Sequence, residues 1–329
     1  MPKQRPDVLR RVTRLGFGGA AIGNLFAQVD DAAAAEAVNA AWAGGFRYFD
    51  TAPHYGLGLS ERRLGDALRS RPRDEYVLST KVGRILEPMA GEIPAGLRDD
   101  EGFDVRRTHR RRWDFSGDGV RQSIEESLQR LGLDRIDIAY LHDPDDHADQ
   151  ALAEAYPALE KLRAEGVVGA IGVGMNQSAL PARFVRETDI DLVLLAGRYT
   201  LLDQSGLADL LPAAAAHGVA VVLGGVFNSG LLADPRQAAT YDYAPAPEPI
   251  LRRALEIERV CLEHGVPLRA VALRFGFGHP AIISTLIGVR DAGQAEDCAA
   301  LAGVAIPTEL WEDLRTRGLL PPDVPVPTE

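Results

Sequence analysis

Cysteine and long apolar runs are scarce in this sequence, and each absence limits what the protein is. Only two cysteines occur, Cys261 and Cys298, and they fall in helical stretches without the spacing of metal ligands, so we expect buried free thiols and no metal site. Residues 1–5 are not followed by an apolar segment, and no run of about 18 apolar residues occurs anywhere. These features predict a soluble, cytoplasmic protein without a membrane partner.

Positive charge is also in deficit, with 36 Lys+Arg against 47 Asp+Glu and a formal net charge of -11. A protein that binds the phosphate backbone of nucleic acid requires a basic face, so no nucleic-acid partner is expected. The one basic run, over residues 106–112, lies in a loop-like stretch. It is predicted to be solvated or to contact an anion.

Eight segments with the character of buried strands alternate with helical segments along the chain. The strands are predicted near Leu15, Phe46, Tyr76, Ile136, Ala170, Asp191, Val219 and Ile282. Continuous apolar runs between helices indicate parallel strands covered on their outer face, and eight such units favour a closed (β/α)8 barrel over an open sheet. A hydrophobic content of 46% suffices for a full core, and no linker or repeat divides the chain. We therefore expect an α/β TIM-barrel fold, with residues 1–329 as a single domain.

Several local elements can be predicted around these strands. Residues 8–14 are expected to form an N-terminal β-hairpin, residues 204–216 one helix, and Ser60 is expected to cap a helix over residues 61–70. The connection over residues 82–116 is too long to be a simple link between a strand and a helix. It is therefore predicted to be a long active-site loop that reaches over the barrel mouth.

Four side chains with acid–base chemistry lie at or just beyond the ends of three predicted strands. Asp50, Lys81 and His142 end these strands, and Tyr55 follows the first of them by a few residues. In a barrel of this kind the carboxyl ends of the strands surround the active site. A free phenol, with a pKa near ~10, is a weak acid at neutral pH, but an adjacent ammonium favours its ionised form. Although each residue alone is more often a structural hydrogen bonder, the set predicts proton transfer at a carbonyl or alcohol oxygen, which usually accompanies hydride transfer.

The residues around these four side chains resemble the signature of the aldo-keto reductases. The runs that carry the resemblance are Asp50-Thr51-Ala52-Pro53-His54-Tyr55-Gly56, Ser79-Thr80-Lys81 and Leu141-His142, and it extends over about residues 12 to 315. The resemblance implies that Tyr55 is the general acid/base and is tuned by Lys81 and Asp50. His142 is then the residue that orients the substrate. It also implies a nicotinamide cofactor, NAD or NADP, bound by the barrel without a Rossmann domain.

Softer cues, such as Trp113-Asp114-Phe115-Ser116, resemble the branch of this family that contains bacterial aldose 1-dehydrogenases and pyridoxal 4-dehydrogenases. By this resemblance the protein is expected to oxidise an aldose such as L-fucose at C1 to the lactone, while oxidation of pyridoxal or reduction of a simple aldehyde or ketone stays open. Trp113 and His54 are candidate substrate contacts, with the alternative that Trp113 only pins its loop. Asp143, directly after His142, is either a carboxylate that supports His142 or part of a solvated acidic run over residues 143–149, and the acidic run is the favoured interpretation.

The resemblance also assigns residues to the cofactor. Asn176 is expected to hold the nicotinamide carboxamide and Tyr199 to stack on the nicotinamide ring, whereas Ala196 replaces the family's usual glutamine. The pyrophosphate loop is predicted to contain Gly225, Val226, Phe227, Gly230 and Leu232, and the adenosine end to contain Gly288, Arg290 and Gln294. A 2′-phosphate requires guanidinium or ammonium partners, and only Arg290 is present there, which favours NAD over NADP.

Three other hypotheses stay open at this point. Residues 16–21 fit the G-x-G-x-x-A pattern of a Rossmann dehydrogenase, although no helix starts at these glycines. A barrel lyase would use Lys81 as a Schiff base, but the neighbouring Asp50 and Tyr55 favour a charged lysine. A non-catalytic nucleotide-sensing barrel would bind the cofactor without turnover. The sequence also leaves open whether the chain forms a homo-oligomer.

Overall fold

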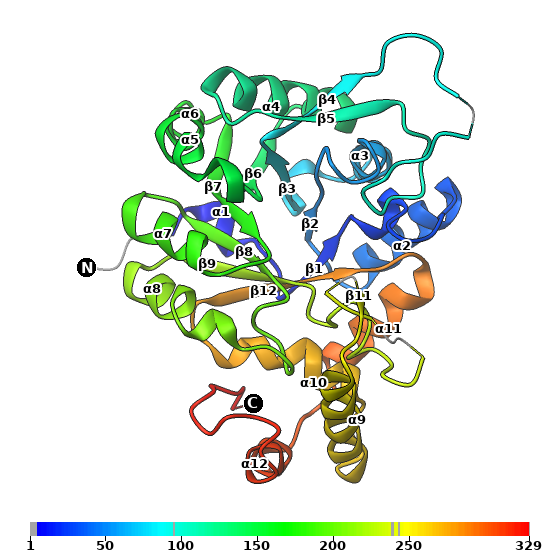
Figure 1. The fold of residues 1–329 in the computed structure, drawn as a ribbon, viewed down its shortest axis with the longest axis vertical. Coiled ribbons are helices and arrows are strands. Elements are labelled where there is room, and N and C mark those ends of the chain that lie inside the picture. Colours follow the sequence, from blue (N-terminus) through cyan, green and yellow to red (C-terminus); the bar gives the residue numbers. More distant parts are fainter. Residues whose placement is uncertain (1–4, 95, 238–239, 243, 329) are drawn as a thin grey trace.

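The computed structural model describes residues 5–94, 96–237, 240–242 and 244–328, and its centre is a ring of eight parallel strands (Figure 1). These strands are β1 (Leu15–Gly18), β2 (Tyr48–Asp50), β3 (Val77–Val82), β6 (Ile136–His142), β7 (Val168–Met175), β8 (Leu192–Ala196), β9 (Ala220–Gly224) and β12 (Ile282–Gly288). Around the ring the order is β1-β12-β9-β8-β7-β6-β3-β2, and β1 pairs with both β12 and β2, which closes the barrel. The predicted (β/α)8 barrel is confirmed. The Rossmann hypothesis is wrong, because its first glycines lie within a barrel strand.

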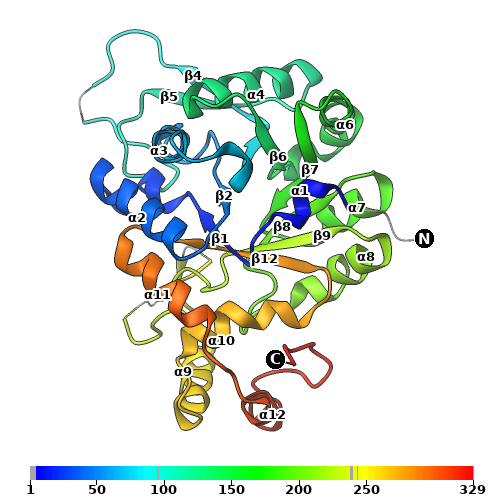
Figure 2. The ribbon, with the colours of Figure 1, turned by 180° about the vertical axis from the view of Figure 1, so that it is seen from behind.

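Helices cover the outer face of the ring, as Figures 1 and 2 show from opposite sides. They are α2 (Asp31–Ala43), α3 (Leu59–Leu68), α4 (Gly117–Leu131), α5 (Ala148–Gln150), α6 (Tyr156–Ala164), α7 (Ala179–Glu187), α8 (Leu210–His217), α10 (Leu268–Phe275) and α11 (Ala292–Ala302). Two further helices lie outside this layer: α9 (Glu248–Glu263) packs on α10, and α12 (Thr308–Thr316) packs on α9. Local caps fix several ends: the Asp30 carboxylate accepts from Ala33 N at 2.8 Å to start α2, and Gly132, with φ 63°, ends α4. In the described part of the chain, no helix is long and apolar enough to cross a membrane.

Alternate residues of each strand point into the barrel, and the residues between them point outward to the helices. The inward side chains form a small apolar cluster, in which Tyr48 and Tyr140 are the largest members. The outward side chains join a larger cluster, in which Phe49 and Leu78 pack between the strands and the helices. Because of this period of two, residues two apart on one strand lie above one another in the barrel interior.

The prediction of an N-terminal β-hairpin is wrong, because the segment forms the one-turn helix α1 (Asp7–Arg10). Pro6 precedes this helix, where its missing N–H group leaves no hydrogen bond unmade. Leu9 is 5% exposed and joins the apolar cluster inside the barrel, and Val8 lies against Gly169 of β7. One turn of helix thus brings apolar side chains to the amino end of the barrel and closes its floor.

Two helix predictions also need correction. Ser60 does not cap α3 but lies inside its first turn, and its buried hydroxyl donates to the Gly19 carbonyl at 2.8 Å. The single helix predicted over residues 204–216 is two elements, the 3-10 turn Ser205–Leu207 and then α8. The Asp209 carboxylate accepts a hydrogen bond from Leu210 N at 2.6 Å and so starts α8 as a separate helix. Both differences come from side-chain hydrogen bonds that the local spacing of residues does not reveal.

The long predicted loop folds as an antiparallel hairpin of two strands, β4 (Arg84–Pro88) and β5 (His109–Trp113). Between them the chain turns back over the barrel, where Phe103 forms an antiparallel bridge with Leu25 and Gly102 O accepts from Phe26 N at 2.9 Å. We call residues 101–104 the strap. A further two-stranded hairpin, β10 (Thr240–Tyr241) and β11 (Ala244–Pro245), follows β9.

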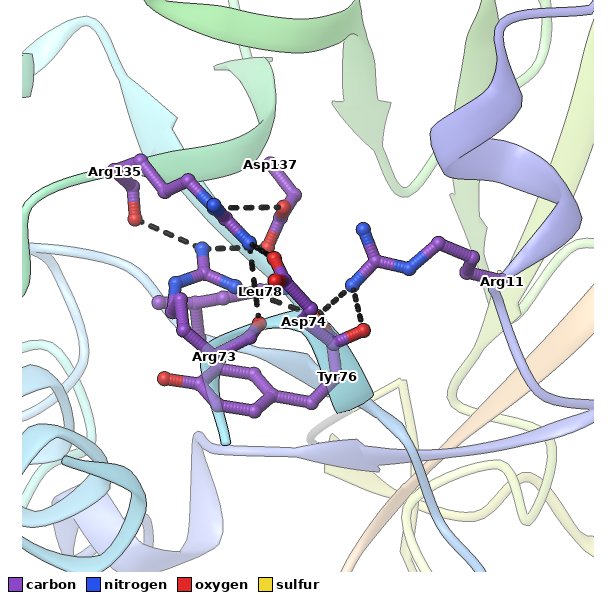
Figure 3. A network of polar contacts seen from close by, with 7 residues as sticks. All are labelled: Arg11, Arg73, Asp74, Tyr76, Leu78, Arg135 and Asp137. Atoms are coloured by element: carbon purple, nitrogen blue, oxygen red, sulfur yellow. Dashed lines mark hydrogen bonds and ion pairs between the residues drawn. The ribbon is translucent and has the colours of Figure 1, made fainter. Parts of the chain in front are cut away.

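Near the amino end of the barrel, a polar network ties neighbouring segments together (Figure 3). Asp137 of β6 accepts hydrogen bonds from Leu78 N at 2.8 Å and from the Arg73 guanidinium at 2.7 Å. Arg11, next to α1, donates to the backbone carbonyl of Tyr76 at 2.8 Å. The network therefore fixes the starts of β3 and β6 and the N-terminal segment, and it lies away from the strand ends that carry the predicted chemistry.

Candidate active site

Strand register brings the predicted acid–base residues together at the carboxyl end of the barrel. Asp50 of β2 lies opposite Ser79 of β3, and Lys81 lies opposite Tyr140 of β6, so their side chains share the barrel interior. The Lys81 ammonium donates to Asp50 Oδ2 at 2.7 Å and to the Thr51 carbonyl at 2.9 Å. Ser79 Oγ donates to Asp50 Oδ1 at 2.6 Å. Lys81, only 2% exposed, and Asp50 thus form a buried ion pair.

Tyr55 and His142 face this ion pair. Lys81 Nζ lies 4.5 Å from the centre of the Tyr55 ring. The Tyr55 and His142 rings stand edge to face, with centres 5.9 Å apart and planes at 88°. The four predicted residues, which come from three strands and one loop, are therefore neighbours in space.

Burial and neighbouring charges decide which of these groups is ionised. Burial alone would lower the pKa of Lys81, but Asp50 and Tyr55 together more than offset this effect and the pKa is raised. Burial, followed by the positive charges of Arg84 and Lys81, holds the pKa of His142 well below its usual range. Burial and Arg84 likewise lower the pKa of His54 to about 2. Lys81 is therefore an ammonium, and both imidazoles are neutral at pH 7 with one donor and one acceptor nitrogen each.

Two glycines fix the turn that carries Tyr55. Gly56 has a φ of 62°, and a Cβ built on it would fall 2.2 Å from the Gly23 carbonyl oxygen. A Cβ on Gly23 would in turn fall 2.9 Å from the Tyr55 carbonyl carbon. Only glycine at both positions allows the two backbone segments to come this close. The turn after β1 therefore sets where the phenol lies.

A cavity of about 450 Å³ opens at the barrel mouth beside these residues. Tyr55, Lys81 and His142 line it, whereas Asp50 lies beneath Lys81. Residues 101–103 of the strap form another part of the wall. The predicted long loop therefore does reach over the barrel mouth.

Two charged residues of the wall, Arg84 and Asp143, were missed by the sequence argument. Arg84 Nη2 donates to Asp143 Oδ2 at 2.5 Å, and Arg84 Nη1 lies 3.7 Å from Glu101. The interpretation of Asp143 as a solvated residue is wrong, because this ion pair holds it in the cavity wall next to His142. A signal was present: Arg84 is a charged residue that follows an entirely buried barrel strand after one glycine.

The two predicted substrate contacts lie in different places. His54 lines the cavity, with its ring centre 5.6 Å from that of His142. Trp113 lies outside the residues that line the cavity, is 42% exposed, and packs beside Phe115 with ring centres 6.0 Å apart. The Arg84 guanidinium lies over the Trp113 ring, 4.3 Å from its centre. The structure therefore brings His54, but not Trp113, to the cavity.

The predicted basic run is partly solvated, because Arg106 is exposed and the Arg110 side chain is 69% exposed, but its arginines also pair with acidic residues of this chain. Arg111 is buried and makes two hydrogen bonds to the Asp99 carboxylate, at 2.6 and 3.0 Å. Arg110 and Arg112 both pair with Glu87 of the same hairpin. Acidic residues of the long loop thus neutralise these charges. Among the described residues, no group of three or more His, Cys, Asp or Glu side chains could hold a metal ion.

A second cavity, of about 200 Å³, adjoins the first and contains two of the residues predicted for the cofactor. Asn176 and Ala196 line both cavities, and Gly225 lines the second. Asn228, also in its lining, is 2% exposed, and neither atom of its side-chain amide has a hydrogen-bond partner among the described residues. A buried amide without partners fits a polar ligand that enters this cavity. Asn228 and its neighbour in the lining, Arg198, were missed from the sequence.

The other predicted cofactor residues are not all at the cavities. Tyr199 is 1% exposed, and its hydroxyl donates to the Pro325 carbonyl at 3.3 Å, so the structure does not bring it to either cavity lining. Arg290 donates to the Leu25 carbonyl at 3.1 Å, and its backbone N–H donates to Gln294 at 3.0 Å. Val226, Phe227, Gly230 and Leu232 lie next to lining residues of the second cavity in sequence but outside its lining, and Gly288, at the end of β12, also lies outside it.

Comparison with known proteins agrees with this geometry. The sequence profile of the Aldo/keto reductase family matches residues 14–316. A D-threo-aldose 1-dehydrogenase from Pseudomonas sp is 48% identical over 94% of this chain and 95% of its own length, and a pyridoxal 4-dehydrogenase from Microbacterium luteolum is 42% identical over 94% and 95%. The solved structure of a glycerol dehydrogenase from Gluconobacter oxydans superposes with a TM-score of 0.74 at 26% identity, over 97% of this chain and 94% of that one. With a closed parallel barrel, a family match over most of its length and oxidoreductases among its relatives, the chain belongs to the aldo/keto reductase family and is an oxidoreductase.

Proposed function

We propose that the protein oxidises an aldose at C1 to the lactone with NAD or NADP, and that Asp50, Tyr55, Lys81 and His142 carry the reaction. The observation that carries this proposal is the position of the Lys81 ammonium. It is buried, held by Asp50, and 4.5 Å from the centre of the Tyr55 ring, beside a cavity that Tyr55 and His142 also line. An ammonium in this position stabilises a phenolate, which an enzyme that removes a proton from an alcohol requires.

Each residue has one task in this mechanism. The neutral His142 imidazole forms a hydrogen bond to the C1 oxygen of the sugar and fixes its orientation. Tyr55, as the phenolate, takes the proton of the C1 hydroxyl, and Lys81 stabilises the charge of Tyr55 before this transfer. A nicotinamide cofactor held by Asn176 and Asn228 would supply the acceptor for the hydride from C1. Loss of one proton and one hydride converts the cyclic hemiacetal to the lactone.

The substrate is proposed from the relatives and from the cavity wall together. The relative at 48% identity is a D-threo-aldose 1-dehydrogenase, so aldoses of that stereochemistry, such as L-fucose, are the first candidates. Arg84, Asp143 and Glu101 supply both donors and acceptors in the cavity wall, which suits a ligand with several hydroxyl groups. Pyridoxal is the second candidate, because another relative, at 42% identity, is a pyridoxal 4-dehydrogenase.

The residues proposed to hold the cofactor are Asn176 and Gly225, to which we add Asn228. The adjoining cavity they line, and the buried Asn228 amide without a partner among the described residues, support this assignment. We retain the preference for NAD over NADP, because Arg290 is the one basic residue predicted at the adenosine end and its guanidinium already donates to Leu25 O. The proposal also keeps a cytoplasmic location and leaves homo-oligomerisation open.

The test is to follow cofactor reduction by absorbance with NAD and with NADP in parallel. The panel contains L-fucose, D-arabinose, L-xylose, L-galactose, D-glucose and pyridoxal. We expect turnover of the sugars that share the stereochemistry of L-fucose and little turnover of D-glucose. Turnover of pyridoxal alone would replace the aldose by the second candidate. Cofactor binding without turnover of any compound in the panel would overturn the proposal and support the hypothesis of a non-catalytic nucleotide-sensing barrel.

A further inference from the structure

Below each of three proposed catalytic residues, the same strand carries a hydroxyl group. The residues two positions before Asp50, Lys81 and His142 are a tyrosine, a serine and a tyrosine. Since residues two apart on a strand point to the same side, these hydroxyl residues lie one layer deeper in the barrel interior. They are Tyr48 of β2, Ser79 of β3 and Tyr140 of β6, and none of them is measurably exposed. We call these three residues the hydroxyl layer.

The hydroxyl layer is a continuous chain of hydrogen bonds that ends at Asp50. The Tyr140 and Tyr48 hydroxyl oxygens are 3.0 Å apart, and Tyr48 Oη is 3.1 Å from Ser79 Oγ. Ser79 Oγ is 2.6 Å from Asp50 Oδ1. A glycine leaves room for one of the rings, since a Cβ on Gly16 would fall 2.8 Å from the Tyr48 ring.

The direction of each hydrogen bond follows by elimination. The Asp50 carboxylate, paired with an ammonium, only accepts hydrogen bonds, so Ser79 must use its single hydroxyl proton on it. Ser79 Oγ can then only accept from Tyr48, and Tyr48 Oη, whose proton is thereby used, can only accept from Tyr140. Burial raises the pKa of both tyrosines, so both keep their protons. Every donor in the chain therefore points toward Asp50.

We propose that Tyr140, Tyr48 and Ser79 are positioning residues which stabilise the Asp50 carboxylate from inside the barrel and so keep the Lys81 ammonium available to Tyr55. Hydrogen bonds aligned in one direction polarise and strengthen one another, so the last bond, to Asp50, is the strongest. The inference rests on the catalytic roles proposed for Asp50, Lys81 and Tyr55.

Other titratable groups around the site act from above and from the side, and the test leaves them unchanged. His54 and His142 face Tyr55 across the cavity. Arg84, with Asp143 and Glu101, lies in the cavity wall, and Arg111 donates to the His54 carbonyl at 3.1 Å. Among the described residues, the one charged side chain that the hydroxyl layer hydrogen-bonds is Asp50, so removal of the layer changes one side of the ion pair.

The experiment compares the pH at which Tyr55 ionises in Ser79→Ala, Tyr48→Phe and Tyr140→Phe. The midpoint is measured from the phenolate absorbance of Tyr55, which is the difference between each variant and the same variant carrying Tyr55→Phe. A second measure is the acid limb of the pH profile of kcat for sugar oxidation. Without its donors Asp50 attracts the Lys81 proton more strongly, so the Tyr55 midpoint should move to higher pH. We expect a graded shift of about one pH unit for Ser79→Ala, about half a unit for Tyr48→Phe and less for Tyr140→Phe.

Tyr76→Phe is the matched control, because Tyr76 is also buried, in the cluster between the strands and the helices, and its hydroxyl has no hydrogen-bond partner among the described residues. We expect no shift for this variant. Equal shifts along the chain, no shift for Tyr48→Phe, or no Tyr55 phenolate before the protein unfolds would each overturn the inference. The phenolate titration requires no turnover, so graded shifts in a protein that oxidises no sugar would reject the proposed substrate and leave the hydroxyl layer supported.

Discussion

The Arg84 guanidinium donates a hydrogen bond to the Asp143 carboxylate at 2.5 Å and so joins the first strand of the long-loop hairpin to the loop that follows His142. The side chain of Arg84 is 10% exposed and that of Asp143 is 27% exposed. Burial of both partners makes the pair sensitive to loss of either one, since the remaining charge would lack a partner in the cavity wall. This pair couples the position of the loop to the cavity wall beside His142.

Arg84→Met should therefore weaken substrate binding more than it slows the chemical step. We expect KM for the sugar to rise by about tenfold or more with a smaller change in kcat, and the free energy of unfolding to fall by about 1–3 kcal/mol. Arg110→Met is the control, because Arg110 lies on the same hairpin but is 69% exposed and pairs with Glu87. The double variant with Asp143→Asn should lose less than the sum of both changes. Additive losses would show that the two residues act separately.

Tyr55→Phe should remove turnover and retain the cofactor. The phenol is the one group of the cavity proposed to exchange a proton with the substrate, and loss of a general acid/base costs about 10²–10⁴-fold. Cofactor affinity, measured by fluorescence titration, should change less than about twofold, because the ring remains. Near-normal kcat in this variant would remove Tyr55 from the mechanism.

Gly56→Ala should lower kcat by moving Tyr55. The new methyl group would collide with the Gly23 carbonyl, and the turn must open to admit it. Gly166→Ala is the control for backbone strain without a collision. Gly166 has a similar φ, 75° against 62° for Gly56, and nothing lies within 4 Å of its Cβ position. Both variants should lose about 1–2 kcal/mol of unfolding free energy from the left-handed backbone. Only Gly56→Ala should lose more than that and lose activity; equal effects would contradict the positioning role of the turn.

The protein should lose stability in mild acid because of its buried neutral histidines. His54 has a pKa of about 2 in the folded chain against 6.5 for the free side chain. Its contribution is therefore fully present above pH 6.5 and is lost as pH falls below 6.5, because only the unfolded chain takes up the proton. The slope is up to about 1.4 kcal/mol per pH unit for one such group. Denaturant unfolding of His54→Gln between pH 7 and 5 should show a shallower slope, whereas the exposed His217→Gln should match the unchanged protein.

Lys81 could be assigned to the site from the sequence alone, whereas Arg84, three residues later, could not. Lys81 ends an apolar strand, and in a parallel barrel every strand end faces the same mouth, so its neighbours Asp50 and His142 could be named in advance. Arg84 lies beyond Gly83 on a hairpin whose course depends on contacts with Phe26 and Asp143. No local pattern encodes those contacts, so the charged wall of the cavity was missed.

The direction of a side chain beyond a strand end could not be predicted from the sequence either. Asn176 and Tyr199 both follow barrel strands, yet Asn176 lines the cavities while Tyr199 packs on Phe275, with ring centres 5.0 Å apart. Side chains alternate between the two faces of the sheet only within a strand. Beyond the strand end, the direction in which a loop residue points depends on tertiary packing. Within β2, β3 and β6 the alternation holds, and the hydroxyl layer could have been derived once Asp50 and Lys81 were accepted as inward-facing.

The floor formed by α1 has an electrostatic consequence for the opposite end of the barrel. Leu9 is 5% exposed and belongs to the same apolar cluster inside the barrel as Tyr48 and Tyr140. With apolar atoms there in place of water, the local dielectric constant stays low and charges at the mouth are screened less. A change at Leu9 to a small or polar residue would admit solvent and weaken the field that Lys81 exerts on Tyr55. Residues at the closed end of the barrel thus help set the acidity of a group at the open end.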